Sequence, residues 1–185
     1  MAIFVTSDWH FGHDREFIYK PRGFDSIEEH DNTLIQRHNS IVSPEDDVWV
    51  LGDLMLGDNA HGLECIKQMN GKLHIVRGNH DTDTRIALYT SLPAVVEVCD
   101  AKYLRYGRYH FFLCHYPTLT GNLEKEALTQ MTCNLFGHTH QQSYFYNDMP
   151  FMVHCGVDSN KGFPLSLDAI ITAMTVKVQE CKSYL

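Results

Sequence analysis

The stretch LHIVRGNHD at residues 73–81 joins a short apolar run to four residues that do not suit a hydrophobic core. Short apolar runs bounded by turn residues are typical of buried strands, and the glycine in this stretch lets the backbone turn sharply. Asn79 carries a neutral carbonyl oxygen, His80 carries an imidazole that can donate or accept a proton, and Asp81 offers a carboxylate that could orient the imidazole. We therefore predict that residues 73–76 form a strand whose carboxyl end contributes one wall of a reaction site.

Other apolar runs, at residues 3–5, 48–51, 110–114 and 133–136, end in polar residues in the same way. The polar residues that follow these runs are Asp8 and His10, Asp53, His115, and finally His138 with His140. Gly-His-x-His is expected by chance roughly 0.05 times and Gly-Asn-His-acid roughly 0.005 times in a chain of this composition. Because ligands of α/β sheets bind beyond the carboxyl ends of the strands, we expect one edge of the structure to collect these side chains.

Helical patterns separate several of the predicted strands. The clearest one covers residues 26–42, where apolar residues recur on one stripe and Ser26 with Glu29 forms a capping-box pair. Further helices are expected at residues 60–69, 82–89, 124–131 and 167–179. For the last of these segments a strand is the alternative to a helix, since Val176 and Val178 alternate as they would in a strand.

The second half of the chain changes in texture. Residues 94–113 are rich in aromatic and β-branched residues, which favours two or three antiparallel strands joined by tight turns, and residues 151–155 predict another strand. Strands alternating with helices indicate a layered α/β fold with an antiparallel portion. No repeat, linker or low-complexity tract interrupts the 185 residues, so we expect a single domain over residues 1–185.

Charge and cysteine usage restrict the partners and the compartment. The net charge of −8 disfavours nucleic acid and anionic membranes as partners, and two bound divalent cations would remove about half of it. The chain has six cysteines but no CxxC pair, which predicts reduced thiols and a cytoplasmic protein. The first residues contain only a short apolar run, too short for a signal peptide, and no apolar segment approaches transmembrane length.

Some of the twelve histidines lie outside the polar strand ends. His13 follows the first motif closely enough to touch a substrate. Four others are expected to be exposed polar residues, namely His30, His38, His61 and His110.

The polar strand ends together form a mixed set of oxygen and nitrogen ligands. The set consists of Asp8, His10, Asp53, Asn79, His115, His138 and His140. It contains no cysteine, which disfavours a closed structural zinc site, and imidazole with carboxylate suits Mn, Fe, Zn or Ni. Seven ligands are too many for one ion with room for a substrate, and they suit two ions that share one carboxylate.

Two metal ions ~3.5–4 Å apart are the arrangement for in-line displacement at phosphorus, because they lower the pKa of a bound water to about 7 and stabilise both reacting oxygens. His80 is left over as a non-ligand beside Asn79. It could therefore act as the general acid for the leaving group, with Asp81 holding its tautomer.

The order of the motifs DWH, GD, GNHD, H and GHTH, from residue 8 to residue 140, resembles the calcineurin-like metallophosphoesterase superfamily. The flanking HFGH, HYP and GVD resemble its small bacterial and phage members, which lack a cap domain. The resemblance implies a four-layer α/β/β/α sandwich with mixed sheets and a dinuclear centre between them, with manganese favoured and iron, nickel or zinc as alternatives. Its implied ligands are Asp8, His10 and His140 for the first metal, Asp53 as the bridge, and Asn79, His115 and His138 for the second metal. His80 would be the catalytic acid.

The chain departs from the family pattern after the Gly-Asp motif. Many members place an arginine shortly after that motif, whereas Leu54, Met55 and Leu56 follow it here. The protein Ser/Thr phosphatases carry the motifs Gly-Asp-x-Val-Asp-Arg-Gly and Gly-Asn-His-Glu. This sequence has neither, which disfavours a phosphoprotein substrate. The cation that binds the substrate phosphate is left open among Arg22, Arg77 and Arg85.

The resulting expectation is a phosphodiesterase or phosphatase acting on a small phosphate ester or nucleotide. The predicted helix at residues 26–42 fills most of the gap between His10 and Asp53, which leaves no room for a cap and implies an open site for phosphodiesters and some monoesters. A nuclease is an alternative, disfavoured by the net charge and by the lack of a basic groove. A non-catalytic binding scaffold is another, disfavoured because a scaffold has no need for all these ligands and His80. The sequence favours no oligomeric state.

Overall fold

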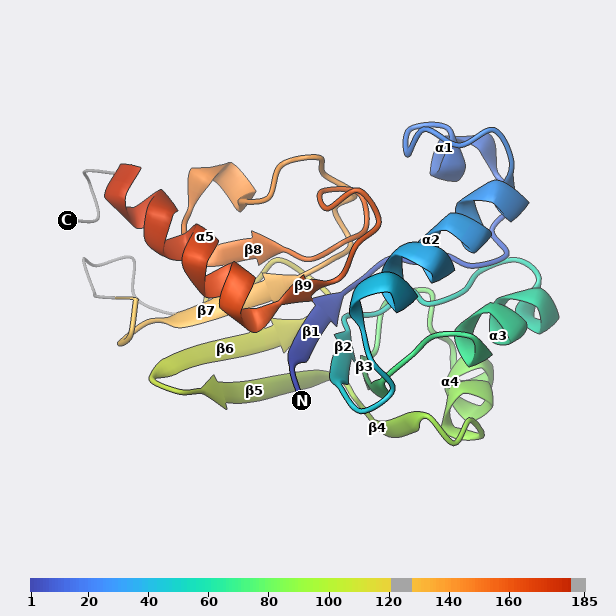
Figure 1. Cartoon of the computed structure of the whole chain (residues 1–185), viewed down its shortest axis with the longest axis horizontal. Helices are drawn as coiled ribbons and strands as arrows, with labels where there is room; N and C mark the ends of the chain where they lie inside the picture. The colour runs from blue at the N-terminus through green and yellow to red at the C-terminus, as the bar shows by residue number, and fades with distance from the viewer. Residues whose placement is uncertain (121–127, 181–185) are drawn as a thin grey trace.

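A five-stranded sheet with the order β4-β3-β2-β1-β9 forms one half of the computed structural model, which describes residues 1–120 and 128–180 (Figure 1). Its strands are β1 (Ile3–Thr6), β2 (Asp47–Val50), β3 (Lys72–Val76), β4 (Val95–Cys99) and β9 (Leu165–Ser166). The first four strands pair in parallel, and β9 joins the free edge of β1 in the antiparallel direction. The parallel strands bring the ends of β1, β2 and β3 to one edge of the sheet.

A second, four-stranded sheet has the order β5-β6-β7-β8. Its strands are β5 (Ala101–Tyr106), β6 (Tyr109–Cys114), β7 (Thr132–Phe136) and β8 (Met152–His154). Strands β5 and β6 pair in the antiparallel direction, whereas β6, β7 and β8 are parallel. Both sheets are therefore mixed.

Two of the two or three antiparallel strands expected in residues 94–113 are present as β5 and β6, whereas the first strand of this region, β4, is not antiparallel. Strand β4 pairs in parallel with β3 in the first sheet, and the chain then passes through Asp100 to β5 in the second sheet. The helix that precedes β4 explains the difference, since a strand–helix–strand connection returns the chain parallel to the strand it left.

Helices surround the two sheets. They are α1 (Glu16–Tyr19), α2 (Ile27–Ile41), α3 (Asn59–Lys67), α4 (Asp83–Thr90) and α5 (Leu167–Glu180), with a 3₁₀ turn at Tyr146–Asp148. At the start of α2 the Ser26 side chain accepts from the Glu29 N–H, while the Glu29 carboxylate accepts from the N–H of Asp25 instead of Ser26. The chain around Val176 is helical, which settles the ambiguity at the last helix. Half of the helix expected at residues 124–131 lies outside the described residues, and the described half, residues 128–131, forms turns and is not helical.

Each central strand of the first sheet is buried on both faces, because its alternate residues enter different hydrophobic clusters. In β2 the side chains of Val48 and Val50 pack in the cluster that contains residues of α2 and α3. Trp49 packs in the other cluster, with the second sheet and α5. Figure 1 shows α2, α3 and α4 on one side of the molecule and α5 on the other. The predicted class is confirmed: this is an α/β fold with two mixed sheets flanked by helices.

None of the helices in residues 1–120 and 128–180 is long and apolar enough to cross a lipid bilayer.

Candidate metal centre

The predicted site residues lie in the loops that follow strands of both sheets. The parallel pairing continues beyond the strands, since the Asp8 N–H donates to the Gly52 carbonyl and the His10 N–H donates to the Asp53 carbonyl, both at 3.0 Å. In the second sheet the N–H of Gly137 donates to the carbonyl of His115, also at 3.0 Å. These backbone contacts fix the ends of neighbouring strands side by side, so that their side chains meet.

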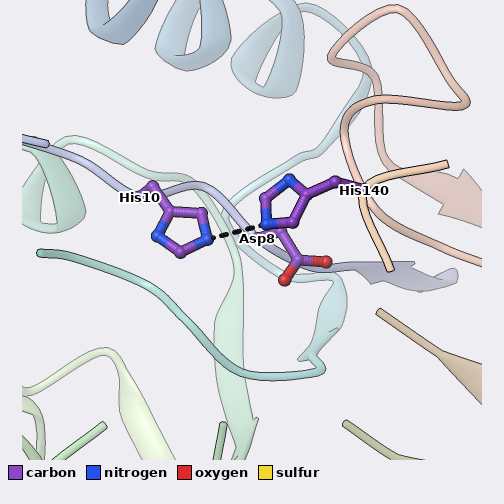
Figure 2. A group of neighbouring side chains, drawn as sticks. All are labelled: Asp8, His10 and His140. Atoms are coloured by element: carbon purple, nitrogen blue, oxygen red, sulfur yellow. Dashed lines mark hydrogen bonds between the residues drawn. The ribbon is translucent and has the colours of Figure 1, made fainter. Parts of the chain in front are cut away.

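One group of candidate ligands consists of Asp8, His10 and His140, whose ligand atoms lie within 4.8 Å of one another. Figure 2 shows the two imidazole rings facing each other beside the Asp8 carboxylate, and their Nε2 atoms are 3.2 Å apart. These are the residues that the family resemblance implied for the first metal. Two nitrogens and a carboxylate directed at one point form a donor set that suits a divalent ion.

A second group combines Asp8, Asp53 and His115 within the same 4.8 Å limit. The Asp53 Oδ2 atom lies 3.5 Å from His115 Nε2 and 3.7 Å from His10 Nε2. The two groups share Asp8, and Asp53 of the second group also lies near His10 of the first, as expected for a carboxylate shared by two ions.

The remaining candidate ligands complete the cluster at its solvent side. The Asn79 side-chain oxygen lies 2.9 Å from His115 Nε2 and 2.9 Å from His138 Nδ1. The structure therefore brings all seven predicted ligand residues into one continuous cluster, although they span residues 8 to 140 of the chain.

The backbone of this cluster adopts an uncommon conformation. Among the described residues, eight that are not glycine have positive φ, and five of these eight are candidate ligands. They are Asp8, His10, Asp53, His138 and His140, with φ between 47° and 67°. Each such residue costs of order 1–3 kcal/mol and persists only where the surrounding structure imposes it, and such residues cluster at functional sites.

Glycines in the motifs allow the close approach of the loops. A Cβ atom at Gly137 would overlap the Ser7 hydroxyl and lie 2.5 Å from Asp8 Oδ2. A Cβ atom at Gly78 would lie 2.6 Å from the backbone nitrogen of Asp53. The glycines of the GHTH and GNHD motifs are therefore required by packing against the two carboxylates.

The electrostatics of the cluster favour a bound cation. Burial raises the pKa of Asp8 to about 6, and burial also raises the pKa of Asp53. Burial lowers the pKa of His10 well below its usual value and also lowers the pKa of His138, so both imidazoles are neutral at pH 7. Desolvated carboxylates with neutral imidazoles are the ligand forms that a divalent ion needs, and its charge would offset the cost of burying the carboxylates. The residues present thus fit the metal pair that the family pattern implies.

His80 lies beside the ligand cluster, and Asp81 does not orient the His80 ring. The His80 N–H donates to the Asp53 carboxylate at 2.9 Å, and its ring centroid lies 5.6 Å from that of His10. The Asp81 carboxylate instead accepts from the N–H groups of Asp53 and Gly78 and from the Tyr89 hydroxyl. The predicted contact between Asp81 and the His80 ring is wrong, because the buried Asp81 side chain turns inward and fixes the Gly-Asp loop.

A charged pair that the sequence did not predict supports His140. Its Nδ1 atom lies 3.0 Å from Asp158, and Arg22 donates to both oxygens of the same carboxylate at 2.9 Å. Burial alone would raise the pKa of Asp158, but His140 and Arg22 hold it well below its usual value. Arg22 is nearly buried and fully engaged, so it is not a free cation for substrate phosphate. The GVD motif at a strand end was the one sequence signal for Asp158.

Two histidines that were expected to be exposed are buried. His30 pairs with Arg22 at 2.8 Å through Nε2, and His38 pairs with the Asn70 carbonyl at 2.8 Å through Nε2. Both lie on the inner face of α2. A sequence pattern alone does not distinguish a hydrogen-bonded core histidine from a solvated one.

A pocket of about 660 Å³ opens beside the cluster. Its walls include His10, His13, His80 and His140, and apolar side chains from the segment at residues 17–21 with Leu56. None of the ten residues that line it is lysine or arginine. Arg77 and Arg85, the other two candidate cations, donate to carbonyl groups of the GNHD loop instead.

Comparison with known proteins places this fold and these motifs in a family. A family model described as the calcineurin-like phosphoesterase superfamily domain matches residues 1–176. The uncharacterized protein MJ1445 of Methanocaldococcus jannaschii is 29% identical over 180 residues, covering 91% of this chain and 89% of that protein. The Gene 66 protein of Mycobacterium phage L5 is 27% identical over 177 residues, covering 83% and 85% respectively.

The fold is shared with a protein of unknown function from Aquifex aeolicus, AQ665, whose crystal structure superposes with a TM-score of 0.68 at 21% identity. The match covers 92% of this chain and 98% of that one. At this identity the likeness shows the fold, while the family model adds the assignment: the chain belongs to the calcineurin-like phosphoesterase superfamily.

Proposed function

We propose that this protein is a metal-dependent phosphoester hydrolase that prefers small phosphodiesters. The observation that carries the proposal is the convergence of two carboxylates, one amide and four imidazoles at facing strand ends of the two sheets. The strained backbone of five of these residues supports a functional origin, because a merely structural cluster has no need for it.

The proposed cofactor is a pair of divalent ions, with manganese favoured over iron, nickel and zinc. Asp8, His10 and His140 would hold one ion, and Asn79, His115 and His138 the other, with Asp53 shared between them. When bound, such a pair activates water and offsets the charge that develops on the phosphoryl oxygens. The carboxylate of Asp53 also accepts a hydrogen bond from the N–H of His80. The same side chain that is proposed to bind both ions therefore also holds the backbone of the proposed general acid.

His80 is the proposed general acid. It lines the pocket, its N–H is held by Asp53, and its carbonyl accepts from Arg85 at 2.6 Å. These backbone contacts fix the position from which an imidazole N–H can donate to the leaving oxygen. Asp81 supports this geometry indirectly, by anchoring the Gly-Asp loop.

The pocket favours a substrate with one negative charge and an apolar substituent. Phe17, Ile18 and Leu56 supply an apolar wall, and His13 stands where it could touch the substrate. A phosphodiester carries a single charge, whereas a monoester carries up to two, and none of the described residues that line this pocket is a lysine or arginine that could compensate the second charge. We therefore expect diesters to be hydrolysed faster than monoesters with the same leaving group.

The same geometry supports one domain over residues 1–185. Neither sheet alone supplies the proposed ligands, since Asp8, Asp53 and Asn79 follow strands of the first sheet while His115 and His138 follow strands of the second. Each proposed ion would need ligands from both sheets. The cytoplasmic location inferred from the cysteines stays a prediction.

The direct test is hydrolysis of bis-p-nitrophenyl phosphate by protein that has been stripped with chelator and reloaded with Mn²⁺. We expect turnover that depends on the added metal and falls by about 10²–10⁴-fold in His80→Ala, the range that general acid catalysis contributes. His110→Ala is the matched control, because its ring contacts the Tyr103 hydroxyl on the second sheet, away from the pocket.

The alternatives give different results in the same preparations. A binding scaffold would show no turnover with any divalent metal, and a nuclease would cleave plasmid or single-stranded DNA at a rate exceeding that on the small diester. Either result would overturn the proposal.

A further inference from the structure

A second group of metal-binding side chains lies between α2 and α3, apart from the seven candidate ligands. It consists of Asp31 on α2 with His61 and Cys65 on α3, and one ligand atom from each lies within 4.8 Å of the others. Asp31 Oδ2 is 2.9 Å from His61 Nε2, Cys65 Sγ is 3.4 Å from the same nitrogen, and the oxygen and sulfur are 3.9 Å apart. Unlike the proposed dinuclear centre, this group includes a thiol.

The helices hold the three side chains in place. His61 and Cys65 are four residues apart, so they lie on one face of α3, one turn from each other. The first turn of α3 is fixed by Asp58, whose carboxylate accepts from the N–H groups of Ala60 and His61. On the opposite helix, Asp31 is nearly fully buried.

The distances fit the edges of a zinc tetrahedron. Zinc bonds of ~2.3 Å to sulfur and ~2.0–2.2 Å to nitrogen and oxygen place tetrahedral ligands about 3.4 Å apart for N and O, and about 3.6 Å apart when one is sulfur. The three distances given above for Asp31, His61 and Cys65 each lie within about half an ångström of these values. Small side-chain rotations would therefore suffice to close the group around an ion.

The surroundings orient the carboxylate as those of a metal ligand do. Asp31 Oδ1 lies 2.7 Å from His30 Nδ1, and Oδ2 accepts from the Gly12 N–H at 3.0 Å. Such outer contacts fix a ligating carboxylate and are typical of metal sites. Burial, followed by the nearby Asp31 carboxylate, raises the pKa of Cys65 to about 12, so the metal-free group holds a thiol.

A route for a cation reaches this group from solvent. The His61 side chain is 43% exposed, and a pocket of about 330 Å³ lies beside it. Three carboxylates line that pocket, those of Asp14, Glu28 and Asp58, and none of its six lining residues is lysine or arginine. Carboxylates around a concave surface raise the local concentration of cations.

We propose that Asp31, His61 and Cys65 bind one zinc ion, or another divalent ion that favours thiolate, with the fourth coordination position open to this pocket. Binding would convert the Cys65 thiol to thiolate and release one proton to solvent, while His61 would bind through Nε2 with its proton on Nδ1. The ion would tie α3 to α2. The site shares no ligand with the proposed phosphoesterase centre.

Cobalt titration of the chelator-treated, reduced full-length protein tests this site, because Co²⁺ bound by thiolate gives a charge-transfer band in the near ultraviolet. The proposed dinuclear centre contains no cysteine and gives no such band. We expect the band in the wild-type protein and in Cys133→Ser, a buried cysteine of β7, and we expect it to be lost in Cys65→Ser. The Asp53→Asn variant should keep the band, which separates this proposal from the proposed function.

His61→Ala is a second variant, and it is expected to fold normally because the His61 side chain is partly exposed to solvent. We expect at least a tenfold weaker cobalt affinity, measured from the same band. A wild-type protein without the band, a band that survives Cys65→Ser, or unchanged affinity in His61→Ala would each overturn the proposal.

Discussion

Four of the seven candidate ligands are at most 1% exposed, whereas the other three reach solvent. We call Asp8, His10, Asp53 and His115 the buried half of the centre, and Asn79, His138 and His140 the rim. The buried half is held by backbone contacts between strand ends and by tight packing against glycines. The rim is held by side-chain contacts, those of Asn79 with His138 and of His140 with Asp158.

The difference indicates which part of the centre is costly to build. Burial raises the pKa of both carboxylates in the buried half. Without a bound cation, the ionised form of these carboxylates therefore lowers the stability of the folded protein. The rim carries no such cost, because it contains no carboxylate and the Asp158 carboxylate beside His140 is already paired with Arg22. The buried half should therefore decide whether metal binds at all, and the rim should tune how tightly it binds.

The largest effect is expected for Asp8→Asn, since Asp8 belongs to both ligand groups. We expect hydrolysis of bis-p-nitrophenyl phosphate to fall by about 10³-fold, the scale for losing one essential electrostatic contact. Kinetics over a range of Mn²⁺ concentrations would check this. Activity restored by more metal would show that the buried half is not essential.

The same variant should be more stable than the wild type when both are free of metal at pH 8. The folded pKa of Asp8 is about 6 and its ordinary value is 3.8, so its contribution is lost as pH rises through about 6, by up to about 3 kcal/mol. Urea unfolding with chelator at pH 4 and pH 8 measures this difference. Asp158→Asn is the control of opposite sign, because a carboxylate with a lowered pKa stabilises the fold at pH 8.

Gly137→Ala tests whether packing positions the buried half. The added Cβ would overlap Ser7 and press on the Asp8 carboxylate. We expect activity to fall by about 10²-fold, since displacing a catalytic group by ~1 Å costs that much. Gly107→Ala is the control, as its Cβ would meet nothing within 4 Å and it should cost only about 1 kcal/mol of stability for its positive φ. Equal activity in the two variants would contradict the packing argument.

A smaller effect is expected at the rim from Asp158→Asn. The variant keeps an oxygen near His140 Nδ1 but loses the charge that orients and polarises the ring. Calorimetric titration with Mn²⁺ should show about 10- to 100-fold weaker binding at one of two sites, the usual cost of removing such a partner. If both sites weaken equally, His140 does not serve one ion alone.

The smallest effect is expected for Phe17→Ala, outside the ligand cluster. Phe17 is 70% exposed and forms part of the apolar pocket wall, so its removal should raise KM by about 3- to 10-fold with little change in kcat. Phe163→Ala, an exposed phenylalanine that does not line this pocket, is the control. A change in kcat without a change in KM would place Phe17 in the chemical step instead.

The sequence predicted the cluster because parallel strands end at a common edge. Polar residues after apolar runs could therefore be assigned to one place without knowing the pairing of the strands. The convergence of residues as distant as Asp8 and His140 follows from that rule and from the family motifs.

Other features depend on side-chain direction, which sequence patterns do not determine. Asp81 follows His80 in the chain but turns into the core toward Tyr89. The pair of Arg22 with Asp158 joins residues that share no local pattern. The positive φ angles at the strand ends likewise arise from tertiary packing, since none of these residues is glycine.

Anomalous diffraction from crystals grown with Mn²⁺ tests the central claim most directly. The account predicts two peaks ~3.5–4 Å apart, with the Asp53 carboxylate between them. Asp8 should lie beside one peak and Asn79 beside the other. A single peak in this cluster, or manganese bound only elsewhere on the protein, would contradict it.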